Sequence, residues 1–449
     1  MNQTADIVIC GAGIMGVAAA HYLSKAGIQN ILLVDERPPI SFTSDRSTEC
    51  YRNWWPDPEM LALINRSIDL MEELANESGN VFHMNRRGYL YVTADESKIA
   101  GLEAASRRTS SLGAGPLRVH SSDASTYQPA HPESFHDSPD GADLLLGNDL
   151  IRKHFPYLTE KAVAALHARR AGWLSAQQLG MYLLETGRRR GVRFESARVT
   201  EVDVANRSVN GVRLSSGERV ASPIFINAAG PYLKSVGKLL GVELPVHTEL
   251  HLKAAIKDPL GVVGRDAPLL IWNDTQTLPW AEEEREALAE DNETRWLTET
   301  FPSGAHTRPE GAGDNILMLW EYQTKVMDPV DPPTMDEQYP EIALRGLAAM
   351  LPRMKEYFAK MPRPQVDGGY YTKTRENRPL VGPMGVDGAY VLGAVSGYGI
   401  MSACGVADLL TKHVTGTNLP AYASEFTLTR YDDPEYEKKL ENWGDSGQL

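Results

Sequence analysis

A glycine pattern near the start of the chain constrains its fold more than any other feature. The apolar run at residues 6–10 predicts a buried strand, small and apolar residues at 13–26 predict a helix, and a second apolar run follows at 31–35. Three glycines match GxGxxG where strand meets helix, and an acidic residue ends the second run: Gly11, Gly13, Gly16 and Asp35. Such glycines permit a tight turn, close approach to a pyrophosphate and close helix packing, while the carboxylate accepts hydrogen bonds from a ribose. A dinucleotide site is therefore predicted; the alternative is a strand-to-helix turn that binds nothing.

Length, charge and cysteine content narrow the class of protein. The 449 residues suffice for two domains, and 45 basic against 59 acidic residues give a formal net charge of −14. This acidity argues against nucleic acid or an anionic membrane as a main partner. Three cysteines without a CxxC spacing predict neither a disulfide framework nor a zinc site, and they fit a reducing cytoplasm. With no signal-peptide pattern and no apolar run of about 18 residues, we expect a cytoplasmic protein without a membrane span.

Hydrophobic periodicity predicts further helices and strands along the chain. We expect helices at 58–76, 176–190, 341–350 and 400–413, and strands at 88–93, 192–195, 197–204, 209–214, 223–228, 245–256, 315–323 and 389–394. Residues 113–148 are rich in Ser, Pro, His, Asp and Gly and predict a solvated surface insertion, with a lid over a site as the alternative. Residues 280–312 predict a helix followed by a long loop.

The elements typical of a dinucleotide fold do not form one contiguous module. They recur near residues 190–230 and 389–413, after long intervening segments. A contiguous module is expected of an NAD domain, whereas this interleaving is typical of FAD-binding chains. We therefore expect an α+β fold that consists of two interleaved domains and a C-terminal extension. These are a discontinuous, FAD-binding Rossmann-like domain at 1–88, 160–245 and 366–416, an antiparallel-sheet substrate domain at 89–159 and 246–365, and a C-terminal extension at 417–449.

Several segments in a fixed order carry a resemblance to a known family. They read GAGIMG with LLVDERPP, TSDRSTECYR, GWLSAQQLGMYL, INAAGPYLKSVGKLLG, YYTKTRENRPLVGP and GAVSGYGIMSACGVADLL. In them the chain resembles the D-amino-acid-oxidase-like flavoproteins, nearest the monomeric sarcosine oxidase and glycine oxidase branch. The resemblance is scattered over most of the chain and implies an FAD-dependent oxidoreductase.

Carried over position by position, the resemblance implies which residues hold FAD. It places the pyrophosphate at the glycine motif, the adenosine ribose at Asp35, and the adenine at Val199. It also implies a polar loop along the flavin and a glycine-rich helix start facing the isoalloxazine ring. The implied set is Gly11, Gly13, Ile14, Met15, Gly16, Asp35, Glu36, Arg37, Ser44, Arg46, Ser47, Thr48, Val199, Ala229, Gly230, Gly397, Tyr398, Gly399, Ile400 and Met401. The alternative for the Ser and Thr residues of the loop is ordinary turn chemistry.

The sequence departs from that branch at positions that the resemblance assigns to substrate. Arg52 matches an arginine that grips a carboxylate, with an outer salt bridge as the alternative. Met401 stands where the branch has a lysine, the second cation that binds the substrate carboxylate. Tyr371 stands where glycine oxidases have an arginine. One cation thus remains where two usually act, which favours a larger substrate or one held by hydroxyl and aromatic contacts. Gly369 replaces the cysteine that links flavin covalently in sarcosine oxidases, so we expect non-covalent FAD.

Other positions leave alternatives open. Where the branch places an oxygen-activating lysine, the best match at residues 317–319 has none, and Lys253 in a neighbouring strand is the expected substitute. Arg375 and Arg378 either face an anion or brace their turn. Six aromatic residues form either a cage for an amine or part of the core: Trp54, Trp55, Trp320, Tyr322, Tyr370 and Tyr371. The histidines show no metal spacing, so no metal is expected.

Together these observations predict an enzyme that oxidises a small amine or an N-alkyl amino-acid-like substrate. Hydride would pass from a C–H next to nitrogen to flavin N5, and water would hydrolyse the resulting imine. The electron acceptor, oxygen or another, stays open, and so does the choice between oxidase and dehydrogenase. One alternative is an FAD-dependent 2-hydroxy-acid or polyol-phosphate dehydrogenase on the same fold. Two others are an NAD-linked dehydrogenase and a flavin-binding protein without turnover.

Overall fold

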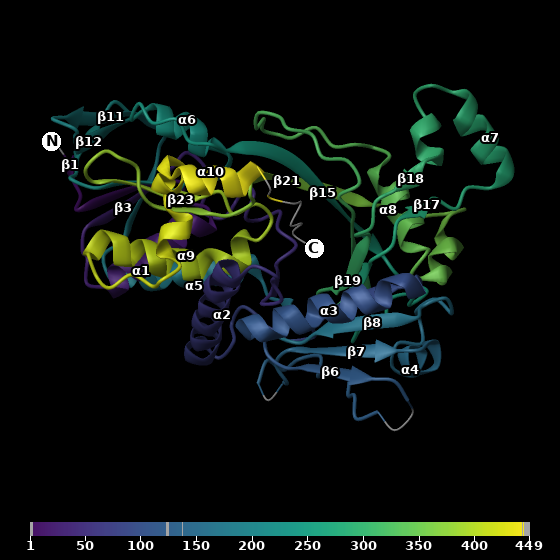
Figure 1. Ribbon diagram of the computed structural model, residues 1–449. Helices are drawn as coiled ribbons and strands as arrows, with labels where there is room; N and C mark the ends of the chain where they lie inside the picture. Colours follow the sequence, from purple (N-terminus) through teal and green to yellow (C-terminus); the bar gives the residue numbers. More distant parts are fainter. Residues whose placement is uncertain (1–2, 123–124, 137, 442, 444–449) are drawn as a thin grey trace.

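The chain folds into two parts, each built around one large β-sheet. The structure is a computed structural model that describes residues 3–122, 125–136, 138–441 and 443. In Figure 1 the part on the left holds the N-terminal strands together with the last long helix, and the part on the right holds the larger sheet. The chain passes between the parts several times, so segments distant in sequence lie side by side within each part.

The left part contains a six-stranded sheet that is parallel except at one edge. Its order is β10-β3-β2-β14-β23-β22, and β22 alone runs antiparallel to its neighbour. The strands are β2 (Ile7–Cys10), β3 (Ile31–Asp35), β10 (Arg193–Ser196), β14 (Phe225–Asn227), β22 (Leu380–Pro383) and β23 (Ala389–Gly393). Its central strands are continuous apolar runs because a parallel sheet covered on both faces is buried on both sides.

Helices cover one face of this sheet and a small second sheet covers the other. Helix α1 (Ile14–Lys25) packs against α5 (Ala176–Arg189) and α9 (Gly399–Thr415), and α2 (Pro58–Ser78) packs on α9. Ile9 and Leu33 point into this helical core, whereas Val8 and Leu32 pack with Val212 of the small sheet. The small sheet has the order β1-β13-β12-β11, with β1 (Gln3–Thr4), β11 (Val199–Ala205), β12 (Ser208–Leu214) and β13 (Arg219–Ala221).

The right part is a nine-stranded sheet in the order β21-β15-β20-β19-β16-β5-β8-β7-β6. Its pairs are antiparallel apart from β16 with β5 and β6 with β7. The strands are β5 (Tyr89–Thr93), β6 (Leu117–His120), β7 (Ala142–Leu146), β8 (Ala164–Ala168), β15 (His247–Lys257), β16 (Leu269–Trp272), β19 (His306–Glu310), β20 (Asn315–Leu319) and β21 (Gln365–Lys373). Helix α8 (Tyr339–Leu347) packs on one face of β15 and β20, where Ala254 and Met318 join its Ile342 in one core.

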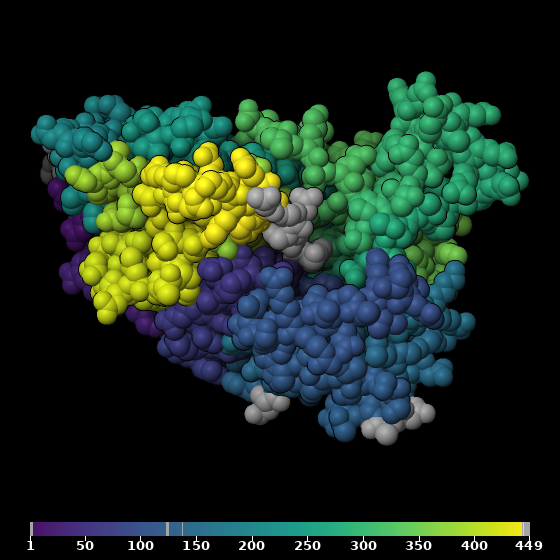
Figure 2. Space-filling model, viewed as in Figure 1, coloured from purple at the N-terminus to yellow at the C-terminus, as the bar shows by residue number. Residues whose placement is uncertain are grey.

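Shorter elements complete the fold. They are the strand pairs β4 (Cys50–Arg52) with β9 (Ala171–Trp173) and β17 (Gln276–Thr277) with β18 (Thr300–Phe301), and the helices α3 (Ile99–Thr109), α4 (Asn148–His154), α6 (Leu233–Lys238), α7 (Glu282–Glu290) and α10 (Pro434–Glu441). Figure 2 shows the segment around α7 standing out from the body of the molecule. No helix in the described part of the chain is long and apolar enough to cross a membrane.

Two segments differ from their sequence-based interpretation. The region 113–148 is not simply a solvated insertion, since its two ends form β6 and β7 at the edge of the large sheet. The region 280–312 holds β18 and β19 beside its helix, where we expected a long loop. Polar and Pro-rich composition hid these short strands. Of them β6 lies at the edge of the large sheet, whereas β19 lies between β20 and β16.

The predicted fold class is confirmed, with a Rossmann-like part interleaved with a substrate part built on a largely antiparallel sheet. The finer domain ranges stay a prediction. Two strands of the large sheet, β8 and β21, lie largely within the ranges 160–245 and 366–416 that we assigned to the first domain.

The C-terminal extension is anchored by a buried ion pair. Arg430 is 2 % exposed and its Nη2 lies 2.6 Å from Oε1 of Glu376, which is fully buried. Glu376 belongs to the turn between β21 and β22, and the hydroxyl of Tyr398 donates to the carbonyl of Asn377 in the same turn. The extension therefore braces a turn that also contacts the start of α9.

Candidate active site

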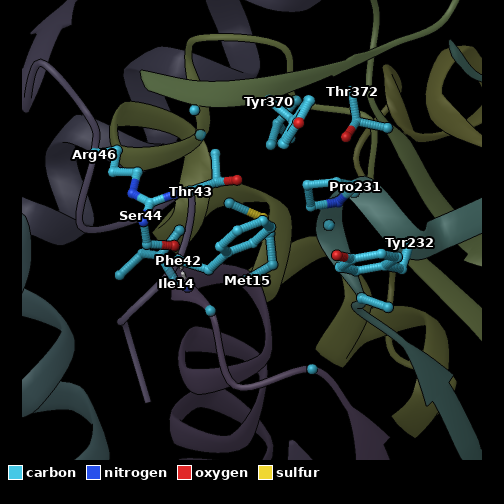
Figure 3. Close-up of a pocket in the computed structure, with 18 of the residues that line it drawn as sticks. Ile14, Met15, Phe42, Thr43, Ser44, Arg46, Pro231, Tyr232, Tyr370 and Thr372 are labelled. Carbon is cyan, nitrogen blue, oxygen red and sulfur yellow. Dashed lines mark hydrogen bonds between the residues drawn. The ribbon is translucent and has the colours of Figure 1, made fainter. Parts of the chain in front are cut away.

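One cavity of about 600 Å³ joins the two large sheets. Its walls come from the ends of β2 and β3, the start of α1, the loop 36–48, β15, the residues after β20, β21 and the start of α9. Figure 3 shows side chains from the start of α1, the loop 36–48, the segment after β14 and β21 around the same space. The glycine motif thus opens onto the same continuous space as β15, β19 and β21 of the nine-stranded sheet, which are called the substrate-side strands below.

Glycine is required at two motif positions by close backbone contacts. Gly11 has a φ of +110°, and a Cβ there would lie 2.3 Å from the carbonyl oxygen of Ala228. A Cβ on Gly16 would lie 1.8 Å from the carbonyl oxygen of Gly11. These contacts join strand, helix and the next strand tightly, as the motif predicted. At Gly13 the nearest atom to such a Cβ is Oγ of Ser44 at 3.2 Å, on the cavity side.

Asp35 and Ser44 hold the backbone around the motif in place. The carboxylate of Asp35 accepts a hydrogen bond from the amide of Ala12 at 2.7 Å and one from the amide of Arg37 at 2.9 Å. Oγ of Ser44 accepts from the amide of Ile14 at 2.9 Å. An ionised carboxylate has about four acceptor positions, so Asp35 retains capacity for further donors such as hydroxyl groups.

Two helices begin at the cavity without a side-chain cap. The N-cap residues are Gly13 for α1 and Tyr398 for α9, and neither caps its helix with a side-chain hydrogen bond. Gly397, Gly399 and Ile400 line the cavity at the start of α9. Uncapped N-termini present backbone N–H groups and a positive dipole end, which suits anionic groups.

Aromatic and cationic side chains form one wall of the cavity. The ring of Phe42 stacks near that of Tyr232 with centroids 6.1 Å apart, and the guanidinium carbon of Arg37 lies 4.7 Å from the Phe42 centroid. Nε of Arg46 lies 3.3 Å from Oδ1 of Asp367. Figure 3 shows Phe42 and Tyr232 among the side chains around the open space.

His251 lies between two carboxylates at the substrate-side end. Its Nδ1 is 3.1 Å from Oε1 of Glu321 and its Nε2 is 3.1 Å from Oε2 of Glu249. Burial opposes the charged form of His251, but Glu321 and Glu249 outweigh it and raise the pKa of the imidazole. The bond to His251 and the ammonium of Lys373 hold the pKa of Glu249 at about 2. The pKa of Glu321 is lowered too, because the attraction of His251 exceeds the effect of burial.

Two further nitrogen bases line the same end of the cavity. Nδ1 of His306 is 2.7 Å from the carbonyl oxygen of Gly304, so it carries the ring proton and leaves Nε2 as the acceptor. Burial lowers the pKa of His306, which favours the neutral ring. Nζ of Lys253 donates to the carbonyl of Ser47 at 2.9 Å, and burial lowers its pKa.

The structure brings most of the expected residues together around the cavity. The expected residues that line it are Gly11, Gly13, Ile14, Met15, Asp35, Glu36, Arg37, Ser44, Arg46, Ser47, Thr48, Val199, Ala229, Gly230, Gly397, Gly399, Ile400, Tyr371 and Lys253. Gly16, Tyr398, Met401 and Arg52 are not among the lining residues. Of the six aromatic candidates, Trp320, Tyr370 and Tyr371 line it, whereas Tyr322 packs on Trp296, Trp320 and Tyr339.

Arg52 and Arg378 are both buried within the protein. Nε of Arg52 donates to the carbonyl of Trp54, and its guanidinium carbon lies 4.9 Å from the ring of Trp55 and 5.7 Å from that of Tyr89. Arg378 contacts the carboxylates of Asp57, Glu59 and Glu425, so it braces its turn, one of the two alternatives left open. The expected role of Arg52 as an anchor for substrate stays a prediction.

Sequence reasoning missed His251, His306 and Glu321. His251 stands two positions before Lys253, and alternate residues of a strand face the same side, so this spacing was enough to find it. Glu321 lies between the two aromatic residues that we singled out, Trp320 and Tyr322. His306 lies in a segment interpreted as loop, and no pattern in the sequence pointed to it.

This fold and cavity are those expected of a dinucleotide-binding protein. The family model described as "FAD dependent oxidoreductase" matches residues 6–413, and the chain belongs to this family. The resemblance inferred from the sequence motifs is therefore confirmed, and with it the dependence on FAD.

Relatives and solved structures support the same family. The human mitochondrial protein "Dimethylglycine dehydrogenase" is 23% identical over 439 residues, which is 96% of this chain but 45% of that protein. The chain thus spans about half the length of this relative. L-proline dehydrogenase from P. horikoshii has a TM-score of 0.74 at 18% identity and covers 96% of this chain and 99% of its own. Glycine oxidase from Geobacillus kaustophilus has a TM-score of 0.73 at 15% identity with the same coverage. These structural likenesses show the fold.

The residues of the cavity fit FAD. Two uncapped helix starts suit its anionic groups, and the close packing at Gly11 and Gly16 forms the tight turn that a pyrophosphate site needs. Asp35 retains acceptor capacity for a ribose, and Val199 lines the cavity beside Arg198 and Thr200. We expect these groups to hold the dinucleotide.

Proposed function

We propose that this enzyme oxidises a small amine or an N-alkyl amino-acid-like substrate at the carbon next to nitrogen. The imine that forms would be hydrolysed by water. Support comes from the family, whose relatives include proteins named for dimethylglycine and sarcosine, and from the composition of the cavity wall. The substrate itself and the path of the hydride are parts of this proposal.

The observation that carries the proposal is the continuity of the cavity. The same space is lined by Gly13 and Gly399 at the helix starts and by His251, Tyr371 and His306 on the substrate-side strands. The family resemblance assigns the flavin ring to the glycine-rich start of α9, which lines this cavity. A substrate held by β15, β19 and β21 would therefore lie beside that ring. Bound FAD supplies the two-electron acceptor for a hydride.

The protein's own side chains would manage the substrate's protons. An amine must lose its ammonium proton before hydride can leave the neighbouring carbon, because the nitrogen lone pair drives that loss. His306 is neutral with Nε2 as its acceptor, so we assign it the role of taking this proton. Tyr371 and Trp320 would supply the flat apolar walls that orient a small amine.

Lys253 is the side chain that we propose to govern the electron acceptor. Lys253 lines the cavity and donates a hydrogen bond to the carbonyl of Ser47. Burial lowers the pKa of its ammonium group. Lys253→Met should slow reoxidation of the reduced holoenzyme if oxygen is the acceptor. Unchanged reoxidation by oxygen in the variant would assign acceptor choice to other residues. Slow reoxidation of the unaltered holoenzyme by oxygen would favour a dehydrogenase.

The test is anaerobic reduction of the bound flavin by a panel of compounds. The panel contains N-methyl amino acids, D-amino acids, simple amines, 2-hydroxy acids and polyol phosphates. We expect loss of the flavin absorbance with members of the amine groups. His306→Gln should slow reduction of the flavin by amines most at low pH, where the ammonium form of the substrate dominates. Glu283→Gln, a substitution of an exposed residue, serves as the control.

A 2-hydroxy acid or a polyol phosphate is the second candidate substrate. A hydroxyl substrate needs a nearby base, and the neutral ring of His306 on the cavity wall is such a base. Reduction of the flavin by hydroxy acids or polyol phosphates, with no response to any amine, would favour this candidate.

A further inference from the structure

The substrate-side end of the cavity carries an acidic side chain. Among the lining residues that the structure describes, the acidic ones are Asp35, Glu36 and Glu321. Asp35 ends β3 and Glu36 follows it, far from the substrate-side strands in sequence and sheet. Glu321 follows β20, and its side chain is 34% exposed although the neighbouring Trp320 is buried. Glu321 therefore brings an open carboxylate to the surface of the cavity.

The contacts of His251 keep this carboxylate ionised. A carboxylate oxygen faces each ring nitrogen, Glu321 at Nδ1 and Glu249 at Nε2, both at 3.1 Å. Carboxylates only accept hydrogen bonds, so both ring nitrogens must donate, and a ring with two N–H groups is the imidazolium cation. Glu249 is also paired with Lys373 at 3.0 Å. The positive ring thus stabilises the negative charge of Glu321, whose carboxylate also meets the phenol hydroxyl of Tyr371 and remains 34% exposed.

Cations that would bind a substrate carboxylate are less available at this end. Nζ of Lys253 is engaged with the carbonyl of Ser47, and Nε of Arg46 is paired with Asp367, while Nη1 of Arg46 is buried without a hydrogen-bond partner among the described residues. Arg52 and Met401 do not line the cavity. They occupy the positions at which the sarcosine oxidase branch binds the substrate carboxylate with an arginine and a lysine. The wall around Glu321 is completed by aromatic rings, those of Tyr371 and Trp320. A carboxylate beside aromatic faces suits a cation.

We propose that Glu321 anchors a cationic group of the substrate, and that His251 is the positioning residue that holds Glu321 ready for it. The substrate class is then an amine that carries a second positive nitrogen, such as a distal amine or guanidinium, beyond the nitrogen next to the oxidised carbon. This inference rests on the proposed amine oxidation. The reacting nitrogen must become neutral before hydride leaves, whereas a distal cation keeps its charge and its bond to Glu321 throughout.

The test compares three secondary N-methylamines of matched length whose tails end in an ammonium, a methyl or a carboxylate group. We expect the highest kcat/KM for the ammonium tail. Glu321→Gln should lower kcat/KM for that compound by about tenfold to a hundredfold, since a charge-assisted hydrogen bond is lost. It should change the value for the methyl tail little. Glu283→Gln, an exposed carboxylate on α7, is the matched control and should leave all three values unchanged.

The role of His251 is tested by a pH profile. The titratable and charged groups around the Glu321–His251 pair come from four elements. They are Glu249 and His247 on β15, Lys373 and Tyr371 on β21, His306 on β19 and Tyr339 on α8. In the His251→Gln variant the neighbouring cation is gone, so Glu321 would protonate at higher pH. The pH below which KM for the ammonium tail rises should therefore move upward, while KM for the methyl tail does not follow it.

A binding measurement separates this inference from the proposed function. Calorimetry with an alkylguanidinium ion that offers no oxidisable amine should show binding to the holoenzyme that Glu321→Gln weakens by a similar factor. Preference for the carboxylate tail, or an equal loss on all three tails in Glu321→Gln, would overturn the inference. If no amine reduces the flavin but guanidinium binding still depends on Glu321, the proposed function fails and the cation site stands.

Discussion

The imidazole ring of His251 stacks on the phenol ring of Tyr371, with centroids 3.7 Å apart and an angle of 13° between the planes. The two residues lie on paired strands, where His251 is directly opposite Gly369 and Tyr371 opposite Glu249. A Cβ on Gly369 would lie 3.4 Å from Cγ2 of Thr43 and 3.5 Å from Cβ of Arg46, so this position faces the loop 36–48.

The ion pairs of Glu249 predict a pH dependence of stability. The folded-state pKa of Glu249 is about 2, below its ordinary value of 4.5. A carboxyl whose pKa is depressed on folding stabilises the fold above its unfolded pKa, and this contribution disappears as the pH falls through the folded value. Glu249→Gln should therefore lower the free energy of unfolding by about 2 kcal/mol at neutral pH and by much less near pH 2. Urea denaturation measures both, and a loss that does not vary with pH would contradict this account.

Gly13→Val should abolish FAD binding while the protein still folds. A Cβ at Gly13 meets only Oγ of Ser44 at 3.2 Å, so the side chain projects toward the cavity and not into the packed core. There it would occupy the place of the pyrophosphate. The ratio of flavin to protein absorbance in the purified variant is the measurement. Gly101→Ala is the control, since a Cβ at that helical position meets no atom within 4 Å. Full flavin content in Gly13→Val would refute the assignment of this motif to FAD.

FAD should be released intact when the protein is denatured. Gly369 lines the cavity where a linking cysteine would stand. Cys10 also lines the cavity, at the end of β2, but burial raises the pKa of its thiol and so disfavours the reactive thiolate. Acid precipitation should leave the yellow colour in the supernatant, as read by its absorbance. Colour that stays in the pellet would show a covalent link through another residue.

Arg52→Ala decides between two roles for that side chain. Its guanidinium lies over Trp55 and Tyr89 and it is 4% exposed, so we expect a structural brace. Its loss should lower the free energy of unfolding by about 2 kcal/mol, because a buried cation–π contact and a hydrogen bond disappear. KM for amine substrates should change little. The sequence-based role as a carboxylate anchor predicts instead a loss of kcat/KM of about tenfold to a hundredfold with unchanged stability.

The sequence predicted the dinucleotide half of the molecule better than the substrate half. The glycine motif and Asp35 follow local rules of turn and helix geometry, so their spacing alone defines their place. Gly397 and Gly399 were likewise found beside the cavity, although they lie far from Gly13 in the chain.

The substrate end depends instead on how strands from distant segments pair. The pKa of His251 is raised by Glu249 on the same strand and by Glu321 after β20. Neither segment alone predicts the sheet order that brings these residues together. Arg52 matched its motif position, and its guanidinium lies over the rings of Trp55 and Tyr89, so its role at the substrate end stays a prediction.

The most direct test of the proposed function is the rate of flavin reduction with a deuterated amine. Under anaerobic conditions, stopped-flow absorbance follows the loss of the oxidised flavin band after mixing with the best amine of the panel. We expect slower reduction when deuterium replaces hydrogen on the carbon next to the reacting nitrogen, and no change when it replaces hydrogen at the far end of the tail. Reduction by hydroxy acids or polyol phosphates, with no amine able to bleach the flavin, would contradict the account.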